Sequence, residues 1–192
     1  MIILSSMHIL SAQPISFKDV SAERGLHFVH DHGGTDQKFY IETMGSGCCL
    51  LDYDNDNDLD VFFLQGAPLT GWNKGVTLRN QMFRNDDGQF TDVTGESGLG
   101  ATSYGVGCAA ADYDNDGDTD LYITNFGEAL FYRNEGNGTF ADVTYISGIS
   151  NDAWGSSAAF LDADQDGWLD LYVSNYVKYS IDNNCLLYTS DA

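Results

Sequence analysis

A nine-residue pattern of alternating aspartates occurs three times in this chain of 192 residues. Loop 1 spans residues 52–60, loop 2 spans residues 112–120 and loop 3 spans residues 162–170. Carboxylates placed this close together repel one another unless a cation lies among them. The pattern therefore predicts three similar turns, each suited to hold a cation, and the fold of the chain must repeat with them.

The segments that flank the loops repeat as well. A run of small residues precedes each loop, and β-branched and aromatic residues follow it, which is typical of paired β-strands. Residues 82–94 and 131–144 each have the pattern of a strand, a glycine-containing turn and a second strand. The loops begin 60 and 50 residues apart (112 minus 52, and 162 minus 112). The blades of β-propellers are four-stranded units that repeat at roughly 40 to 50 residues, which is close to the spacing of the loops.

The sequence thus predicts an all-β fold, a partial β-propeller with two complete four-stranded blades and one half blade. No segment shows the sustained 3.6-residue apolar period that a helical solenoid would need. Residues 15–21 match the last strand of a blade, although no blade precedes them. Propellers commonly close their ring with a terminal strand, so we expect residues 15–21 to be an N-terminal closing strand.

The two ends of the chain depart from the repeat. Residues 1–12 form a short apolar run that ends in small residues, and we expect a remnant of a signal peptide there, with a leader strand as the alternative. Residues 185–192 match no part of the repeat and resemble the translation of an adapter used in sequencing libraries, with a natural polar tail as the alternative. The propeller fragment is therefore expected over residues 13–184.

The charge of the chain is concentrated in the loops. The formal net charge is −21, and 14 of the 29 acidic residues lie in loops 1 to 3. Only eight lysines and arginines are present, which argues against partners such as nucleic acid or anionic membranes. A hydrophobic content of 43% argues against disorder, and no apolar stretch is long enough to span a membrane.

Each loop offers oxygen ligands at positions 1, 3, 5, 7 and 9. The aspartate side chains can turn inward, and the residue at position 7 contributes its backbone carbonyl. Hard oxygen ligands in a flexible loop suit Ca²⁺ best. We predict that the Ca²⁺ ligands are, in loop 1, Asp52, Asp54, Asp56, Asp58 (by its backbone) and Asp60; in loop 2, Asp112, Asp114, Asp116, Asp118 (by its backbone) and Asp120; and in loop 3, Asp162, Asp164, Asp166, Trp168 (by its backbone) and Asp170.

Position 6 of each loop should have a positive φ, because the turn is sharp. Gly117 and Gly167 allow this directly, and Asn57 tolerates the left-handed region better than most residues. An EF-hand is excluded, since it needs Glu at position 12 and flanking helices. Mg²⁺ retains its waters and prefers a strict octahedron, and Zn²⁺ prefers His or Cys. A solvated acidic turn without a metal is the remaining alternative.

Other candidate sites are weaker. Cys48 and Cys108 each precede a loop by four residues, and we expect free, buried thiols rather than a disulfide. His30 and His32 could share one face of a strand and hold a transition metal, but hydrogen bonding in a connecting loop is the favoured interpretation. The Trp and Tyr residues, Trp72, Trp154 and Trp168 among them, could line a carbohydrate platform, although packing between blades is the more common role of such residues.

Several motifs connect the chain to a known family. They are residues 41–47 leading into loop 1, the pairs Arg84–Asn85 and Arg133–Asn134, the Phe-x-Asp-Val-Thr strands at 90–94 and 140–144, and residues 174–177. With these motifs, residues 15 to 180 resemble the FG-GAP/VCBS repeats of integrin-α-like β-propellers. The closer resemblance is to secreted proteins that carry such repeats ahead of an ASPIC/UnbV domain, the cartilage acidic protein-like group. The resemblance implies a seven-bladed propeller, Ca²⁺ in the blade loops, export, and a role in adhesion or ligand binding.

No arrangement of catalytic residues is recognisable. The chain has no Gly-x-Ser-x-Gly, no phosphate-binding Gly-Lys-Ser/Thr and no His-Glu-x-x-His. We therefore predict that it is not an enzyme but a secreted or cell-surface calcium-binding scaffold, periplasmic or extracellular. Its partner would be an extracellular protein or glycan, bound at the end opposite the aspartate loops. The alternatives are a propeller domain of a larger secreted carbohydrate-active enzyme and a purely structural surface protein.

Overall fold

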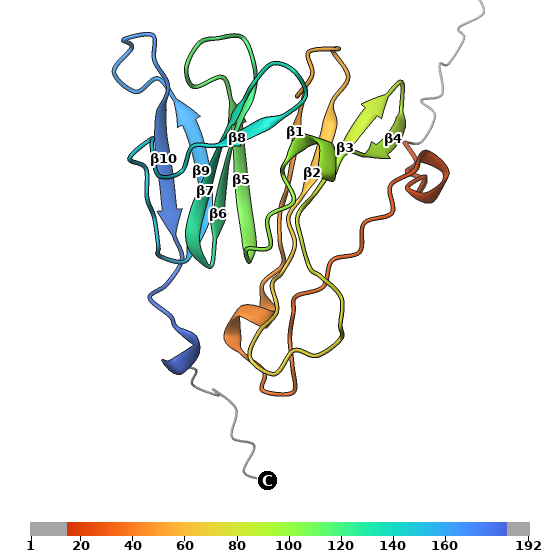
Figure 1. Cartoon of the computed structure of the whole chain (residues 1–192), viewed down its shortest axis with the longest axis vertical. Coiled ribbons are helices and arrows are strands. Elements are labelled where there is room, and N and C mark those ends of the chain that lie inside the picture. Colours follow the sequence, from red (N-terminus) through yellow and green to blue (C-terminus); the bar gives the residue numbers. More distant parts are fainter. Residues whose placement is uncertain (1–14, 184–192) are drawn as a thin grey trace, which may run out of the picture.

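The computed structural model describes residues 15–183, which form three antiparallel β-sheets standing side by side (Figure 1). The first two sheets have the strand orders β1-β2-β3-β4 and β5-β6-β7-β8, and the third pairs β9 with β10. These two four-stranded sheets and one two-stranded sheet confirm the predicted all-β partial propeller. The strands are β1 (Cys48–Leu51), β2 (Asp60–Phe63), β3 (Gln81–Asp86), β4 (Gln89–Asp92), β5 (Gly105–Ala111), β6 (Asp120–Asn125), β7 (Gly127–Asn134), β8 (Phe140–Asp142), β9 (Gly155–Leu161) and β10 (Asp170–Asn175). Short helical segments are η1 (Ala22–Arg24), η2 (Tyr40–Thr43), α1 (Thr94–Ser97) and η3 (Ile181–Asn183).

Each aspartate loop joins the first two strands of its sheet. All three loops lie at one end of the molecule, at the top of Figure 1. In every sheet, position 9 of the loop is the first residue of the second strand, and it pairs with the last residue of the first strand. These pairs are Leu51 with Asp60, Ala111 with Asp120, and Leu161 with Asp170.

The middle sheet is buried between the other two. Along β6, Leu121 and Ile123 lie in a hydrophobic cluster shared with the first sheet. Tyr122, between them in sequence, lies in a second cluster that Phe160 and Leu171 of the third sheet contact. This alternation follows from the two-residue period of a strand, whose successive side chains point to opposite faces. The sheets therefore pack face to face, as propeller blades do.

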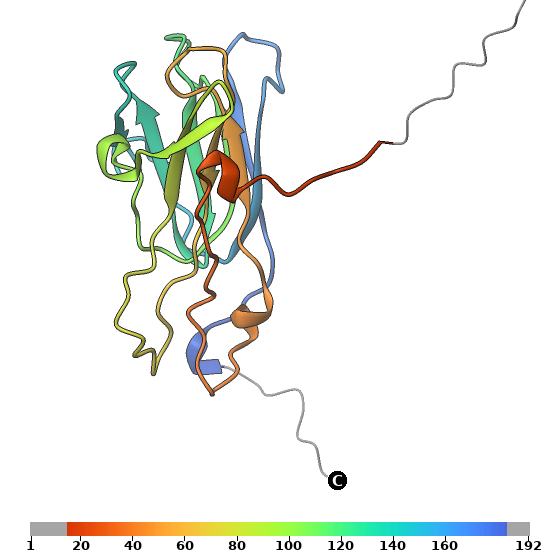
Figure 2. The same cartoon turned by 90° about the vertical axis from the view of Figure 1, so that its right-hand side faces the viewer.

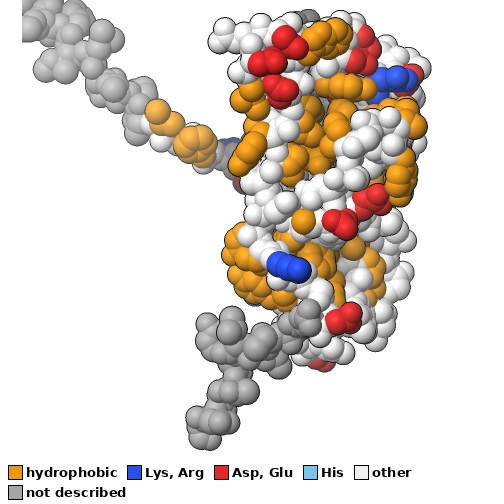
Figure 3. Space-filling model, turned by 90° about the vertical axis from the view of Figure 1, so that its left-hand side faces the viewer, with side chains coloured by type: hydrophobic (Ala, Val, Ile, Leu, Met, Phe, Trp, Pro, Cys, Tyr) orange, Lys and Arg blue, Asp and Glu red, His pale blue; other side chains and the backbone are white. Residues whose placement is uncertain are grey.

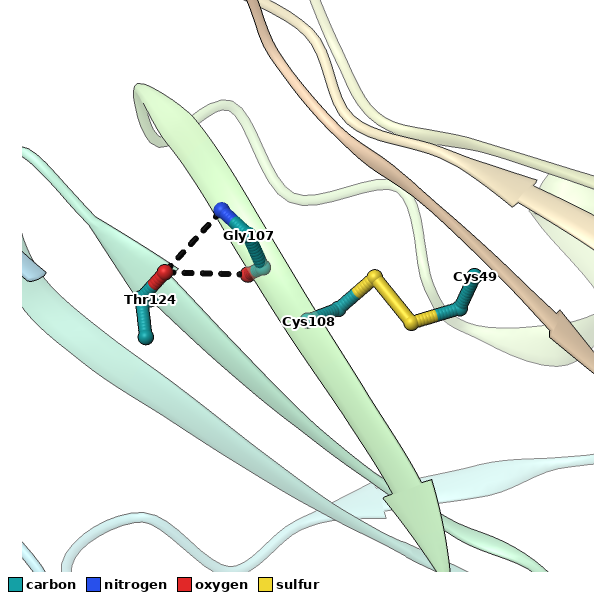
Figure 4. The surroundings of a disulfide bond; sticks show 4 residues. All are labelled: Cys49, Gly107, Cys108 and Thr124. Atoms are coloured by element: carbon teal, nitrogen blue, oxygen red, sulfur yellow. Dashed lines mark hydrogen bonds between the residues drawn. A yellow bond between two sulfur atoms is a disulfide. The ribbon is translucent and has the colours of Figure 1, made fainter. Parts of the chain in front are cut away.

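A disulfide joins the first two sheets, and it corrects the sequence-based expectation of free thiols. Cys49 on β1 is bonded to Cys108 on β5, with their Cα atoms 6.1 Å apart (Figure 4). Cys48, which we expected to be buried, is a free, exposed cysteine. The reason is geometric: Cys48 and Cys108 occupy equivalent places in neighbouring blades, so their side chains face the same way around the ring and cannot meet. The residue after Cys48 faces the next blade instead.

The predicted closing segment has the local geometry of a blade end but forms no strand. Residues 15–20 extend away from the sheets, and the side chains of Ile15 and Phe17 are exposed (Figure 2). Asp19 accepts a hydrogen bond from the backbone N–H of Ser21 at 3.0 Å, just as Asp92 and Asp142 accept one from the threonines two residues after them, at 2.9 and 3.0 Å. Pairing of this segment with another blade stays a prediction.

Within residues 15–183, no helix has both the length and the apolar character needed to cross a membrane. The predicted signal-peptide remnant at 1–12 and the predicted adapter-derived tail at 185–192 lie outside the described residues.

Candidate metal centres

The first aspartate of each loop holds the turn together from inside. In loop 1, Asp52 accepts hydrogen bonds from the backbone N–H groups of Asp56 and Asn57, at 3.1 and 3.0 Å. Asp112 makes the equivalent bonds in loop 2 at 3.1 and 2.9 Å, and Asp162 makes them in loop 3 at 3.1 and 3.1 Å. The repeated spacing in the sequence thus corresponds to one repeated local structure.

The middle of each loop contains two residues in the left-handed region, at positions 4 and 6. Position 6 has a positive φ in all three loops, as predicted: 72° at Asn57, 96° at Gly117 and 92° at Gly167. Position 4 also has a positive φ, which was not predicted. The residues there are Asn55 at 60°, Asn115 at 59° and Gln165 at 64°. Residues with amide side chains tolerate this region, so the loop sequence suits a positive φ at both positions.

The aspartate at position 5 stabilises the turn around position 6. Its Oδ1 atom accepts a hydrogen bond from the backbone N–H at position 7. The distances are 2.8 Å for Asp56, 2.9 Å for Asp116 and 2.9 Å for Asp166. This bond closes the turn and leaves the other carboxylate oxygen available.

The aspartate at position 9 is the most deeply placed member of loops 1 and 2. Asp60 and Asp120 are fully buried, with no exposed surface. Each accepts one hydrogen bond from the backbone N–H at position 2 of its own loop, at 3.0 Å in both cases. Each also accepts one at 2.8 Å from the backbone N–H of an asparagine on the third strand, Asn85 and Asn134 respectively. Asp170 of loop 3 is exposed, and its described partner is the N–H of Ala163 at 3.0 Å.

The predicted ligands at positions 1, 3 and 9 come together in every loop. Each triad offers carboxylate oxygens that all lie within 4.8 Å of one another. The aspartates at position 5 and the residues at position 7 lie outside these triads, so their predicted roles as ligands stay predictions. The triads are Asp52, Asp54 and Asp60; Asp112, Asp114 and Asp120; and Asp162, Asp164 and Asp170.

The electrostatics of loops 1 and 2 favour a bound cation. Burial raises the pKa of Asp60 and of Asp120 from 3.8 to about 6. Burial, followed by repulsion from neighbouring aspartates, also raises the pKa values of Asp54 and Asp114. A carboxylate whose charged form is this disfavoured requires either a proton or a cation to compensate it.

No side-chain cation in the described part of the chain supplies that compensation through an ion pair. The described ion pairs join Lys18 to Glu23, Lys74 to Asp31, Arg84 to Asp86, and Arg133 to Glu135. None of them includes an aspartate of loops 1 to 3. In loop 2, the Oδ1 atom of Asp114 is buried without a hydrogen-bond partner, which is costly unless an unseen partner binds it.

The residues present therefore fit a hard divalent cation. The donors are carboxylate oxygens, one of them buried and unsatisfied, and the loops contain no His or Cys that would favour Zn²⁺. Ca²⁺ suits such a flexible set of oxygen ligands better than Mg²⁺.

Asn85 and Asn134 were recognised in the sequence as repeated motifs, but their contacts with the aspartates at position 9 were not predicted. The repetition of an Arg-Asn pair after loops 1 and 2 is the signal that could have indicated this role. Besides supporting position 9, Asn134 donates from Nδ2 to the backbone carbonyl of Tyr53 in loop 1, at 2.7 Å. It therefore joins two neighbouring loops.

The weaker candidates have ordinary structural roles. The Nε2 atom of His30 lies 3.0 Å from the hydroxyl of Ser46, and neither His30 nor His32 belongs to a metal-ligand group found among the described residues. Trp154 is buried with Tyr104 in the aromatic cluster at the opposite end, as packing between blades predicts. Trp72 lies under the ammonium group of Lys74, 4.6 Å from its ring centre.

Comparison with known proteins agrees with the repeat seen in the fold. None of the curated proteins compared with the chain matches it. A family model described as "FG-GAP-like repeat" matches residues 52–123 and 112–173, two overlapping ranges that each begin at the first aspartate of a loop. Together they span residues 52–173, more than half of the chain, and each range contains two successive loops. The chain belongs to the family of FG-GAP-like repeat proteins.

Proposed function

We propose that the protein is a calcium-binding β-propeller scaffold, with one Ca²⁺ ion held in each aspartate loop. The observation that carries the proposal is the repeated triad of carboxylate oxygens at positions 1, 3 and 9. Two of the triads include a fully buried aspartate, and neither has a side-chain ion pair among the described residues. When bound, Ca²⁺ would supply the positive charge that these buried oxygens lack.

The aspartates have separate parts in this proposal. Positions 1 and 5 use oxygens to hold the backbone of the turn, and positions 3 and 9 bring carboxylates toward the centre. Because the unfolded chain cannot assemble this arrangement, Ca²⁺ would bind the folded state preferentially and stabilise it. Extracellular calcium modules often have dissociation constants of ~10⁻⁴–10⁻³ M, and we expect affinities in this range.

A calorimetric titration of the full chain with Ca²⁺ tests the proposal. The Asp114→Asn variant removes one charge from the triad of loop 2 and should lose the heat of one site. The matched control is Asp36→Asn, which removes the charge of an exposed aspartate outside the three loops and their triads. Equal binding by Asp114→Asn and by the unaltered protein, or no binding by either, would overturn the assignment.

We further propose that the protein works outside the cytoplasm and does no chemistry itself. The disulfide between Cys49 and Cys108 supports an oxidising compartment, such as the periplasm or the exterior of the cell. The motifs shared with cartilage acidic protein-like proteins favour a secreted, adhesive role ahead of an ASPIC/UnbV domain. The partner would be an extracellular protein or glycan, bound at the end of the molecule that carries the aromatic cluster of Phe39, Ile41, Tyr104 and Trp154.

Binding assays against extracellular polysaccharides and matrix proteins test the scaffold role. The labelled full chain should be retained by at least one of them in the presence of Ca²⁺ and released by EDTA. The chain length of a retained polysaccharide should not change. Release of new reducing ends would instead support the carbohydrate-active enzyme alternative.

A further inference from the structure

The amide at position 4 of loops 1 and 2 reaches the next loop along the chain. In loop 1, Asn55 donates from Nδ2 to the Oδ1 atom of Asp118 in loop 2, at 2.7 Å. In loop 2, Asn115 donates from Nδ2 to the backbone carbonyl of Gly167 in loop 3, at 3.3 Å. The same position of successive repeats thus makes a bond in the same direction around the molecule.

A second connection, made by Asn134, also links loops 1 and 2. Asn134 donates from its side chain to the carbonyl of Tyr53 at 2.7 Å and from its backbone to Asp120 at 2.8 Å. Tyr53 is position 2 of loop 1, and Asp120 is position 9 of loop 2. The buried carboxylate of one candidate site is therefore two hydrogen bonds away from the backbone of the other.

These bonds are not needed to hold the blades together. The first two sheets already share a hydrophobic cluster and a disulfide. Asn55 and Asn115 are exposed side chains; Asn55 donates to a carboxylate and Asn115 to a backbone carbonyl. Because an exposed group exchanges a hydrogen bond to water for one within the protein, the net contribution of such bonds to the stability of the fold is modest. The positive φ at position 4 accounts for the amide residues found there. It does not account for the bonds that Asn55 and Asn115 make to the next loop, and these call for a further role.

We propose that the position-4 amide couples Ca²⁺ binding in one loop to Ca²⁺ binding in the next, so that neighbouring sites fill cooperatively. This inference rests on the proposed calcium function and deepens it. Asp118 is the predicted backbone ligand of loop 2, and its side chain is the acceptor for Asn55. An ion in loop 2 would fix Asp118, which fixes Asn55 in its left-handed conformation and lowers the ordering cost of loop 1.

One effect opposes the coupling. A first Ca²⁺ ion makes the local potential less negative, so it weakens the attraction of a second ion to the neighbouring loop. Salt screens this effect between exposed charges, with a Debye length of about 8 Å at physiological ionic strength. The experiment is therefore performed at physiological salt, where the hydrogen-bonded connection should dominate.

Glycine amides give loops 2 and 3 separate signals. Gly117 and Gly167 occupy position 6 of loops 2 and 3, and their N–H groups donate to Asp112 and Asp162 at 2.9 and 3.1 Å. In the full chain labelled with ¹⁵N-glycine, a Ca²⁺ titration followed by nuclear magnetic resonance would report the affinity of loop 2 at Gly117. Asp54→Ala disables loop 1 without altering loop 2.

In the unaltered background, Asp54→Ala should weaken the affinity reported by Gly117 by about fivefold, the lower end of typical allosteric couplings. In the Asn55→Gly background, which keeps the left-handed backbone accessible but lacks the amide, Asp54→Ala should change that affinity little. Asp118→Ala should abolish the coupling, and Asp118→Asn, which retains an oxygen acceptor without the charge, should preserve it. The matched control Asn115→Gly should leave the Gly117 response to Asp54→Ala intact.

The outcomes separate the two levels of the proposal. If Gly117 reports the same affinity with and without Asp54→Ala, or if the coupling survives Asn55→Gly, the coupling role of position 4 is refuted while the calcium sites remain. If neither Gly117 nor Gly167 responds to Ca²⁺ in the unaltered protein, the proposed function itself is refuted and the coupling with it.

Discussion

Within each loop, aspartates of the same type have different duties because their surroundings differ. Positions 1 and 5 accept backbone N–H groups and shape the turn. Position 9 is buried in loops 1 and 2 and receives two backbone hydrogen bonds, whereas the Oδ1 atom of Asp114 at position 3 is buried without a partner. The aspartates of the turn could be recognised from their spacing alone, but the burial of position 9 and its bond to the third strand of the same sheet depend on the folded sheet.

Calcium affinity should depend on pH through the buried aspartates. Burial raises the pKa values of Asp60 and Asp120 to about 6, so protons compete with Ca²⁺ at these two residues. We expect the affinity of loops 1 and 2 to be steady above about pH 7 and to fall as the pH drops through 6. Calorimetric titrations with Ca²⁺ at pH 7.5, 6 and 5 measure this directly, and an affinity at pH 5 equal to that at pH 7.5 would contradict it.

Without calcium, Asp60 and Asp120 should make the folded protein less stable as the pH rises. A salt-bridged aspartate has the opposite effect. Their pKa values are raised in the folded protein above the ordinary value of 3.8, so the folded state binds more protons than the unfolded chain between about pH 4 and 6. Their contribution to the free energy of unfolding is fully present below about pH 4 and is lost as the pH rises through 6. Urea denaturation in EDTA across this range, compared with the Asp60→Asn variant, measures it.

At the scale of strands, the repeat predicted most of the structure but misassigned the cysteines. The alignment of the repeats made Cys48 and Cys108 equivalent. Side chains at equivalent positions of two neighbouring blades point in the same direction, so these two cysteines cannot bond to each other. The bond from Cys49 to Cys108 follows once the sheets are known to pack face to face. Likewise, the link from Asn134 to Tyr53 crosses between blades, 81 residues apart, and no local pattern predicts it.

Removal of the disulfide should lower the free energy of unfolding. Cys49 and Cys108 are separated by 59 residues, and closure of a loop of this length is worth about 4 kcal/mol in the chain-entropy account. The Cys49→Ala/Cys108→Ala double variant should therefore unfold at a lower urea concentration than the unaltered protein. Cys48→Ala, which removes an exposed free thiol, is the control and should unfold like the unaltered protein; the reverse pattern would refute the pairing.

At the scale of the whole molecule, the aspartate loops lie at one end, and η2 and η3 lie at the other (Figure 1). The side of the third sheet carries hydrophobic side chains at its surface (Figure 3), and Leu161 and Tyr172 are 44% and 66% exposed. The sequence predicted the kind of fold and the positions of the loops, because both repeat. It could not predict how the loops are joined, because those contacts lie between repeats.

The most direct measurement of the central claim is the number of Ca²⁺ ions that the full chain binds. Equilibrium dialysis with radioactive calcium, at physiological salt and millimolar Ca²⁺, should reach a plateau of three ions per chain, with loop 3 filling last because Asp170 is exposed. The same dialysis with EDTA should leave none. A plateau clearly below three ions per chain would contradict the assignment of one ion to each loop, and a plateau near zero would contradict calcium binding altogether.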